Sequence, residues 1–213
     1  MTKPNPIWLF RMTHVDNLPH ILQHGLVVAS SPNADPNFRA IGDRSLIGVR
    51  KDLEVPIAPG GMFSEYVPFY LGPRSPMLYQ IVTGYEGVEK IRQEEIIYLV
   101  AKHDCIAEKS LEFVFTDGHA RHNMTQFFNT ADGFEQLDWD TIYAEQWMNT
   151  LEDPDRQRRK QTEYMVKGHV PRECFAIVLV YNEISQQKVE SLLAEAGLEI
   201  PVKVSKKAYY AHL

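Results

Sequence analysis

One carboxylate, Glu163, stands out in the sequence because it closely follows a run of basic residues. Residues 156–171 read RQRRKQTEYMVKGHVP, so Glu163 lies at the head of a β-branched and aromatic run that predicts a strand. Such a carboxylate is either a counter-ion for its basic neighbours or an acid held in place for chemistry. The residues alone leave both interpretations open.

The charges around Glu163 form two runs of opposite sign. Residues 131–155 contain eight acids and no Lys or Arg, whereas residues 156–172 contain six Lys and Arg residues. On a chain with a net charge of −6, this basic run indicates either a local patch for an anionic partner or a solvated face. A surface that grips nucleic acid everywhere is excluded, because phosphate contacts require many basic side chains.

Other reactive arrangements in the sequence are weak or absent. The phosphate-binding pattern GxxxxGK followed by Ser or Thr, the dinucleotide pattern GxGxxG and the nucleophile elbow GxSxG do not occur. His119 and His122 could share a helix face and ligate a metal, but no further ligand is evident nearby. Many acids could form a glycosidase pair, and their spacing selects none. Cys105 and Cys174 have neither metal nor redox spacing, so we expect reduced packing residues.

The elements that must position these residues are predicted to be a mixture of strands and helices. Helices are predicted from Asp16 to Gly25 and over residues 183–197, each with an apolar stripe and a terminal glycine. Residues 29–39 predict a loop, and Asp43 could cap a short helix that carries Arg50. Residues 61–81 predict an extended segment, a turn and an apolar run. Strands are predicted over residues 7–12, 95–103, 111–117, 162–170 and 174–181, with a final strand near the C-terminus.

The composition is that of an ordinary globular chain. The 213 residues are 44% hydrophobic and 23% charged, and no repeat or change in composition divides them, so we expect one domain over residues 1–213. No apolar run approaches the roughly 20 residues that a membrane-spanning helix requires. The N-terminus lacks the apolar region of a secretory signal. We therefore expect no membrane contact and a cytoplasmic location.

Four blocks of the sequence carry a resemblance to a known family. They are RMTHVDNLPHILQHGL at 11–26, YVPFYLGPRSPMLYQI at 66–81, FTDGHA at 115–120 and RKQTEYMVKGHVP at 159–171. In this order and spacing the chain resembles the DarT family of DNA ADP-ribosyltransferases, the toxins of toxin–antitoxin pairs, from about residue 6 to residue 209. The resemblance implies an α+β fold of the ADP-ribosyltransferase type, with central β-sheets flanked by helices.

The resemblance implies that NAD is a substrate and that no metal takes part. Glu163 matches the catalytic position, where a carboxylate stabilises the positive charge that develops on the ribose as nicotinamide leaves. Arg50 matches a family arginine that acts on NAD and on the target base, with Arg44 as the alternative, and His119 matches a residue that faces the base. The residues implied to contact NAD are Arg11, Met12, Thr13, His14, Asn17, His20 and Arg50.

The resemblance also implies single-stranded DNA as the acceptor, with thymine modified at its ring nitrogen N3. That nitrogen is hidden in a duplex, so the enzyme must take a single strand or flip the base. A macrodomain antitoxin that removes the ADP-ribose is the implied protein partner. Guanine, RNA or protein as acceptor, or a catalytically silent nucleic-acid-binding module, are the alternatives. The side chains expected to clamp the strand are Arg74, Arg156, Arg158, Arg159, Lys160 and Tyr164.

Overall fold

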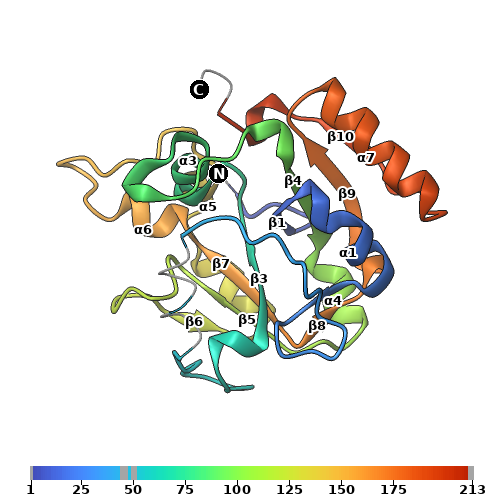
Figure 1. The fold of residues 1–213 in the computed structure, drawn as a ribbon. Coiled ribbons are helices and arrows are strands. Elements are labelled where there is room, and N and C mark those ends of the chain that lie inside the picture. Colours follow the sequence, from blue (N-terminus) through green and yellow to red (C-terminus); the bar gives the residue numbers. More distant parts are fainter. Residues whose placement is uncertain (1, 44–47, 49–51, 211–213) are drawn as a thin grey trace.

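Strands from the N-terminal, middle and C-terminal parts of the chain meet in one sheet (Figure 1). This computed structural model describes residues 2–43, 48 and 52–210. The eight-stranded sheet has the order β10-β9-β4-β1-β3-β7-β5-β6, and its neighbours are antiparallel except for β9 and β10. The strands are β1 (Trp8–His14), β3 (Tyr66–Tyr70), β4 (Ile96–Lys102), β5 (Phe113–Thr116), β6 (Phe127–Phe128), β7 (Glu163–Lys167), β9 (Phe175–Val180) and β10 (Val202–Val204).

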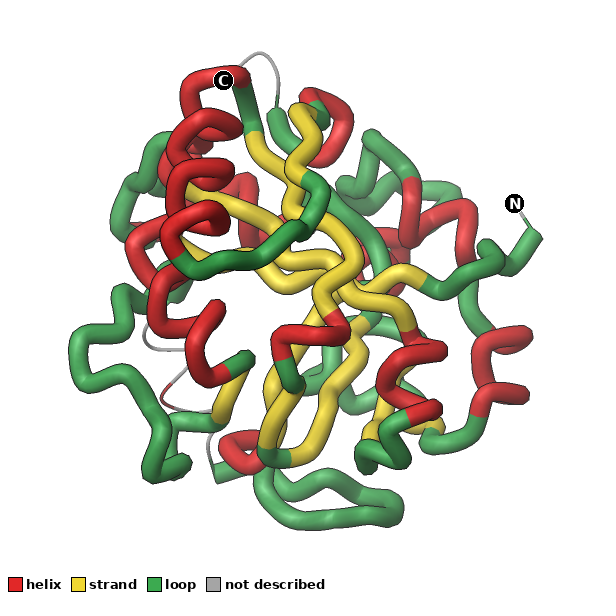
Figure 2. The backbone as a smooth tube through the Cα atoms, turned by 90° about the vertical axis from the view of Figure 1, so that its right-hand side faces the viewer, coloured by secondary structure: helices red, strands yellow, loops and turns green. Residues whose placement is uncertain are grey.

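Helices lie on both sides of these strands (Figure 2). A second, two-stranded sheet pairs β2 (Leu26–Val27) with β8 (His169–Val170). The α-helices that can be described are α1 (Leu18–His24), α3 (Pro76–Thr83), α4 (His103–Glu108), α5 (Trp139–Tyr143), α6 (Arg156–Lys160) and α7 (Glu183–Glu195). Short 3-10 helices cover Val15–Asn17, Phe63–Glu65, Tyr85–Gly87, Gln93–Glu95, Ala131–Gln136, Arg172–Cys174 and Lys206–Ala208.

The central strand β4 is buried on both faces, and the two faces belong to different cores. Ile97 and Leu99 pack with residues of α1 and α7, whereas Ile96 and Tyr98 pack with residues of α3. This division follows from the strand geometry, because successive side chains point to opposite faces of a sheet. The continuous apolar run of β4 is therefore the sequence signature of a strand covered on both sides.

The predicted helix at the N-terminus is confirmed, with a different N-terminal cap. The Gly25 backbone has φ 74° and its N–H donates to the Ile21 carbonyl at 2.8 Å, which ends α1. Asp16, expected to cap the helix with its side chain, instead donates its backbone N–H to Nδ1 of His14 at 3.1 Å. The predicted helix over residues 183–197 is confirmed as α7, where the Asn182 side chain accepts from the Ser185 N–H.

The predicted strands are confirmed, except that the strand predicted over residues 162–170 is divided at Gly168 into β7 and β8, which belong to different sheets. Most of the missed elements are short helices. The apolar run that ends the segment 61–81 is helix α3, which begins after the capping side chain of Ser75 and with Pro76 at its first position. The predicted C-terminal strand is confined to β10. The helix expected to carry Arg50 falls on residues outside the described part of the chain.

The prediction that the two cysteines are reduced packing residues is wrong. Cys105 of α4 and Cys174, the residue before β9, form a disulfide with a Cα–Cα distance of 5.5 Å. The two residues are 69 positions apart in the sequence, so only the packing of α4 beside the start of β9 brings them together. Among the described helices, none combines the length and the apolar character needed to cross a membrane.

Candidate active site

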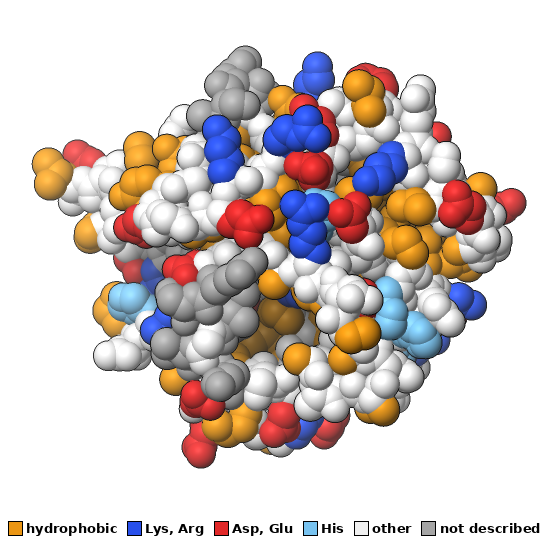
Figure 3. Space-filling view, in the orientation of Figure 1, with side chains coloured by type: hydrophobic (Ala, Val, Ile, Leu, Met, Phe, Trp, Pro, Cys, Tyr) orange, Lys and Arg blue, Asp and Glu red, His pale blue; other side chains and the backbone are white. Residues whose placement is uncertain are grey.

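A cavity of about 550 Å³ opens between strands β1 and β3, within the range of small-molecule sites in proteins. Figure 3 shows a hollow on this face whose visible walls are hydrophobic. The cavity is lined by residues of β1 and β3, the segment 25–29, the loop 34–43, the turn that carries His119, and Glu163 at the start of β7. Residues from all four sequence blocks, at 11–26, 66–81, 115–120 and 159–171, thus line the same cavity.

The cavity exists because β1 and β3 separate. β1 pairs with β4 along its whole length, but its pairing with β3 is confined to Phe10 opposite Tyr70. Beyond that pair the edge of β1 faces the cavity instead of a neighbouring strand. The Arg11 guanidinium spans the gap and donates to the Pro68 carbonyl at 3.0 Å. Backbone groups on such an open edge can pair with a planar amide, as expected for nicotinamide.

Glu163 lies in register with this opening. It is opposite Tyr70 in the pairing of β3 with β7, so Phe10, Tyr70 and Glu163 form a row across three strands. Its side chain lines the cavity although the residue is only 2% exposed. The structure therefore places this carboxylate at the buried end of the cavity, which favours the interpretation of a positioned acid over that of a surface counter-ion.

One residue at the end of β5 and one in the turn that follows it hold Glu163 in place. The Ala120 N–H donates to Oε1 of Glu163 at 3.0 Å, and the Glu163 N–H donates to the Thr116 hydroxyl at 3.1 Å. The same hydroxyl donates to the Gly118 carbonyl at 2.6 Å. A charge-assisted bond from a backbone N–H orients a carboxylate strongly, so the turn and the acid form one unit. Thr116 and Ala120 were missed because their roles depend on backbone geometry.

The residues predicted to contact NAD divide into a cavity wall and its support. Arg11, Met12, Thr13 and His20 line the cavity, and His119 joins them from the opposite side. His14 is buried outside the lining, and burial lowers the pKa of its imidazole. Arg50 and its alternative Arg44 lie outside the described residues. Contacts of these residues with NAD remain predictions.

Asn17 supports the cavity through its side-chain amide. Its Nδ2 donates to the Thr13 hydroxyl and to the Arg39 carbonyl, both at 2.9 Å, and its Oδ1 accepts from the Arg39 N–H at 2.8 Å. His20 adds a second tie through a 2.8 Å contact of Nε2 with the Asn33 carbonyl. These bonds fasten the loop after β2 to the end of β1, so the loop forms a defined wall of the cavity.

Two of the residues predicted to clamp DNA are core residues, and that prediction is wrong for them. Tyr164 is fully buried, and its hydroxyl lies 3.0 Å from Nδ1 of His103. Lys160 is 2% exposed and donates to the carbonyls of Ile142 and Ala144 at 2.8 and 2.9 Å. Burial lowers the pKa of the Lys160 ammonium to about 7. Neither side chain can reach a strand of DNA at the surface.

Arg158 and Arg159 are already engaged by carboxylates, which corrects the expected basic clamp. Arg158 bonds Asp155 through Nε and Nη2, both at 2.7 Å, and Asp117 through Nη1 at 2.8 Å. Arg159 pairs with Asp138, Asp153 and Asp155. Carboxylates of the acidic run 131–155, together with Asp117, therefore pair with Arg158 and Arg159, so neither guanidinium group offers an unpaired charge to a phosphate backbone.

The two remaining arginines of the expected clamp, Arg156 and Arg74, contact other groups. Nε of Arg156 donates to the Gln146 carbonyl at 2.8 Å. The Arg74 guanidinium lies over the Tyr210 ring at 4.7 Å and 3.6 Å from Glu145. Their contact with DNA remains a prediction. Arg121, which the sequence analysis missed, lines the cavity two residues after His119 and adds a basic side chain there.

The described residues include no group of three or more His, Cys, Asp or Glu side chains placed to hold a metal ion. His119 and His122 belong to one turn, in which the His122 N–H donates to the His119 carbonyl at 3.0 Å. The carboxylate of Glu163 and the imidazole of His119 line the cavity together with the open edge of β1.

Known proteins match this chain over nearly its whole length. The sequence model of the family described as "ssDNA thymidine ADP-ribosyltransferase, DarT" matches residues 10–210. A DNA ADP-ribosyl transferase of Escherichia coli is 33% identical over 208 residues, which cover 98% of this chain and 95% of that protein. A DNA ADP-ribosyl transferase-DNA ADP-ribosyl glycohydrolase fusion protein of Thermosipho africanus is 26% identical over 125 residues, 58% of this chain and 30% of the fusion.

Two solved structures of the Thermus sp. 2.9 DarT have the same fold. The complex with ADP-ribosylated ssDNA superposes with a TM-score of 0.90 at 33% identity and covers 99% of both chains. The complex with NAD+ has a TM-score of 0.84 at 34% identity and covers 98% of this chain and 100% of the other. The expected α+β fold is thereby confirmed. With its fold, its cavity and its sequence in agreement, the chain belongs to the DarT family of NAD-using DNA ADP-ribosyltransferases.

Proposed function

We propose that this protein transfers ADP-ribose from NAD to a thymine base of single-stranded DNA, as the toxin of a toxin–antitoxin pair. The observation that carries the proposal is the position of Glu163, buried at the cavity that opens where β1 leaves β3. The family description names single-stranded DNA and thymidine, and the structural relatives hold NAD+ and ADP-ribosylated ssDNA. Both support the same reaction for this chain.

The reaction places one demand on the carboxylate of Glu163. The bond between ribose C1′ and the nicotinamide nitrogen breaks, positive charge develops on the ribose, and neutral nicotinamide leaves. A fixed carboxylate beside the ribose stabilises that charge and accepts a hydrogen bond from the 2′-hydroxyl. Because Ala120 and Thr116 hold Glu163 from the turn and the strand, the carboxylate needs no reorganisation as charge develops.

The acceptor base must present its nitrogen to C1′ and lose a proton. In the proposed reaction the N3–C1′ bond forms as the N3 proton of thymine leaves. His119 lines the cavity with Glu163 and is the proposed hydrogen-bonding or proton-accepting partner of the base. Arg50 is proposed as a partner for the base oxyanion, a role that suits an arginine better than proton removal. A single strand supplies the base without the cost of opening a duplex.

The decisive experiment is incubation with NAD and single-stranded oligonucleotides that differ by one base, followed by mass spectrometry. The expected result is a mass gain of one ADP-ribosyl group that requires a thymine and is absent with Glu163→Gln. A gain that follows guanine instead would refute thymine specificity but retain the transferase. No gain on any DNA, with a gain on RNA or protein, would move the proposal to those acceptors.

The partner in the proposed pair is a glycohydrolase that removes the modification. The Thermosipho africanus fusion, in which the two named activities occur in one chain, supports this pairing. We propose that residues 1–213 act as one domain, because the central sheet joins strands from both ends of the chain. The proposed location is the cytoplasm. Growth arrest on expression, relieved by a DNA ADP-ribosyl glycohydrolase but not by an inactive variant of it, is the expected result.

A further inference from the structure

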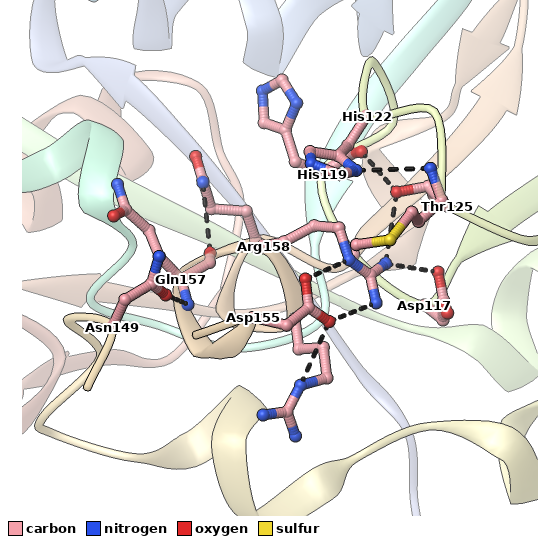
Figure 4. A network of polar contacts seen from close by, with 12 residues as sticks. Asp117, His119, His122, Thr125, Asn149, Asp155, Gln157 and Arg158 are labelled. Atoms are coloured by element: carbon pink, nitrogen blue, oxygen red, sulfur yellow. Dashed lines mark hydrogen bonds and ion pairs between the residues drawn. The ribbon is translucent and has the colours of Figure 1, made fainter. Parts of the chain in front are cut away.

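The Arg158 side chain lies at the base of the turn that carries His119. This side chain is 10% exposed. It donates hydrogen bonds to Asp155 through Nε and Nη2, and to Asp117 through Nη1 (Figure 4). These bonds hold the pKa of Asp155 below its ordinary value and raise that of Arg158. The guanidinium therefore links helix α6, which precedes β7, to the turn of residues 117–126.

The same residue closes both ends of the turn. Nη1 of Arg158 also contacts the Thr125 hydroxyl at 3.2 Å, and that hydroxyl donates to the His119 carbonyl at 2.7 Å. The Arg158 carbonyl accepts the His119 N–H at 2.9 Å. Arg158 thus contacts the turn near its beginning, at His119 and near its end, through its side chain and its backbone (Figure 4).

The turn is what connects Arg158 to the carboxylate. Ala120, next to His119, donates its N–H to Glu163, and both His119 and Glu163 line the cavity. Arg158 itself does not line the cavity. A rigid chain of contacts therefore runs from Arg158 through His119 and Ala120 to Glu163, only five residues further along the sequence.

We propose that Arg158 is a positioning residue for the transferase reaction, and not a contact for DNA. It fixes the turn of residues 117–126 on α6, so that the Ala120 N–H orients the Glu163 carboxylate and His119 stays at the cavity. This inference rests on the proposed function. Its physical basis is that displacement of a catalytic group by about 1 Å can cost 100-fold in rate.

Kinetics of Arg158→Gln test the proposal. The amide cannot bond Asp155 and Asp117 together, so we expect kcat to fall by about 10- to 100-fold while KM for NAD and for DNA stays within about twofold. Arg158→Lys is expected to recover little, because an ammonium lacks the planar fork that holds two carboxylates. A raised KM for DNA with kcat unchanged would overturn the proposal and restore the phosphate contact.

Arg159→Gln is the matched control. Arg159 is the next residue of α6 and is paired with three acids, where Arg158 is paired with two, but the partners of Arg159 lie in the segment 138–155 and not in the turn. We expect a comparable loss of thermal stability and a change in kcat of less than about threefold. Equal losses of kcat in the two variants would contradict a specific role for Arg158.

A second variant, Gly118→Ala, disturbs the contact between the turn and Arg158 without removing a charged side chain. A Cβ at Gly118 would lie 2.9 Å from the Arg158 carbonyl oxygen, closer than carbon and oxygen ordinarily approach, so Gly118→Ala pushes the turn away from α6. We expect it to reproduce the kcat loss of Arg158→Gln. Unchanged kcat in this variant would argue that the position of the turn on α6 does not matter.

Hydrogen exchange separates this inference from the transferase reaction itself. In Arg158→Gln, but not in Arg159→Gln, we expect the amides of residues 117–126 to exchange at least about tenfold faster than in the parent protein. Inactivity of the parent protein on every acceptor would refute the proposed function, while this exchange difference would still support the fixing of the turn. Equal exchange in both variants would refute that fixing whatever the activity.

Discussion

The free energy of unfolding of the parent protein should increase with pH above about pH 7, and replacement of Lys160 by Met should remove this increase. Lys160 is 2% exposed, and burial lowers the pKa of its ammonium from 10.5 to about 7. Between these values the unfolded chain holds a proton that the folded chain has released, so the free energy of unfolding increases with pH. Below pH 7 both the folded and the unfolded chain hold the proton, so Lys160 no longer makes the free energy of unfolding depend on pH.

The magnitude follows from the same two values. The slope approaches about 1.4 kcal/mol per pH unit above pH 7, which amounts to somewhat under 3 kcal/mol between pH 7 and pH 9. Methionine has a similar volume but no proton to release. The carbonyls of Ile142 and Ala144 lose their donor in Lys160→Met, at a cost of about 1–3 kcal/mol each that does not vary with pH. The slope therefore distinguishes titration from the loss of hydrogen bonds.

The assay is urea unfolding of the parent protein and of Lys160→Met at intervals between pH 6 and pH 9. We expect the difference in unfolding free energy to be constant below pH 6.5 and to grow in favour of the parent protein above pH 7. Lys203→Met, which removes an exposed lysine of β10, should give parallel curves. Parallel curves for Lys160→Met would show that the Lys160 ammonium keeps its proton on folding, contrary to this reasoning.

Three further predictions concern the site and the disulfide. Glu163→Gln keeps an oxygen for the Ala120 N–H but removes the charge, so kcat should fall by about 10²- to 10³-fold at an unchanged melting temperature; full turnover would exclude Glu163 from the chemistry. Asn17→Ala breaks the bonds that fasten Arg39 to Thr13 across the loop, and KM for NAD should rise by about tenfold in steady-state kinetics with a smaller effect on kcat. The double substitution Cys105→Ser and Cys174→Ser should lower the free energy of unfolding by up to about 4 kcal/mol, since the bond closes a segment of 69 residues. Dithiothreitol should destabilise the parent protein but not the double variant, and equal sensitivity of both proteins would contradict the pairing.

The parts of the fold that were predicted from sequence are those with a strong local signal. The apolar run of β4 and the capped, striped helix α7 were predicted because period and end signals agree. The short helices α5 and α6 were missed, since five residues are too few to show a helical period. The disulfide was missed because a pairing across 69 residues depends on tertiary packing alone.

The sequence predicted that Glu163 belongs to the site, but it gave the wrong role to Tyr164, the next residue in the chain. The reason is geometric. Side chains alternate along β7, so a cavity-facing Glu163 requires Tyr164 to face the opposite side, where it packs in the core. The alternation of side chains along a strand can be inferred from the sequence, and it excludes Tyr164 from stacking on a base in the cavity. The pairing of Arg158 and Arg159 with the preceding acids could not be predicted from the sequence. The two charge runs are separate along the chain, and only the folded structure brings their side chains together.

The row formed by Phe10, Tyr70 and Glu163 has a consequence for the timing of activity during synthesis. The three residues belong to strands made early, midway and late in translation, and the row cannot form until β7 has been made and inserted between β3 and β5. Pairings between such distant segments form slowly, because the closure of long loops must precede the contacts. A nascent chain that already contains β1 and β3 therefore still lacks the carboxylate of Glu163. The ability to modify DNA arises only after most of the chain has been made and the late strand has docked.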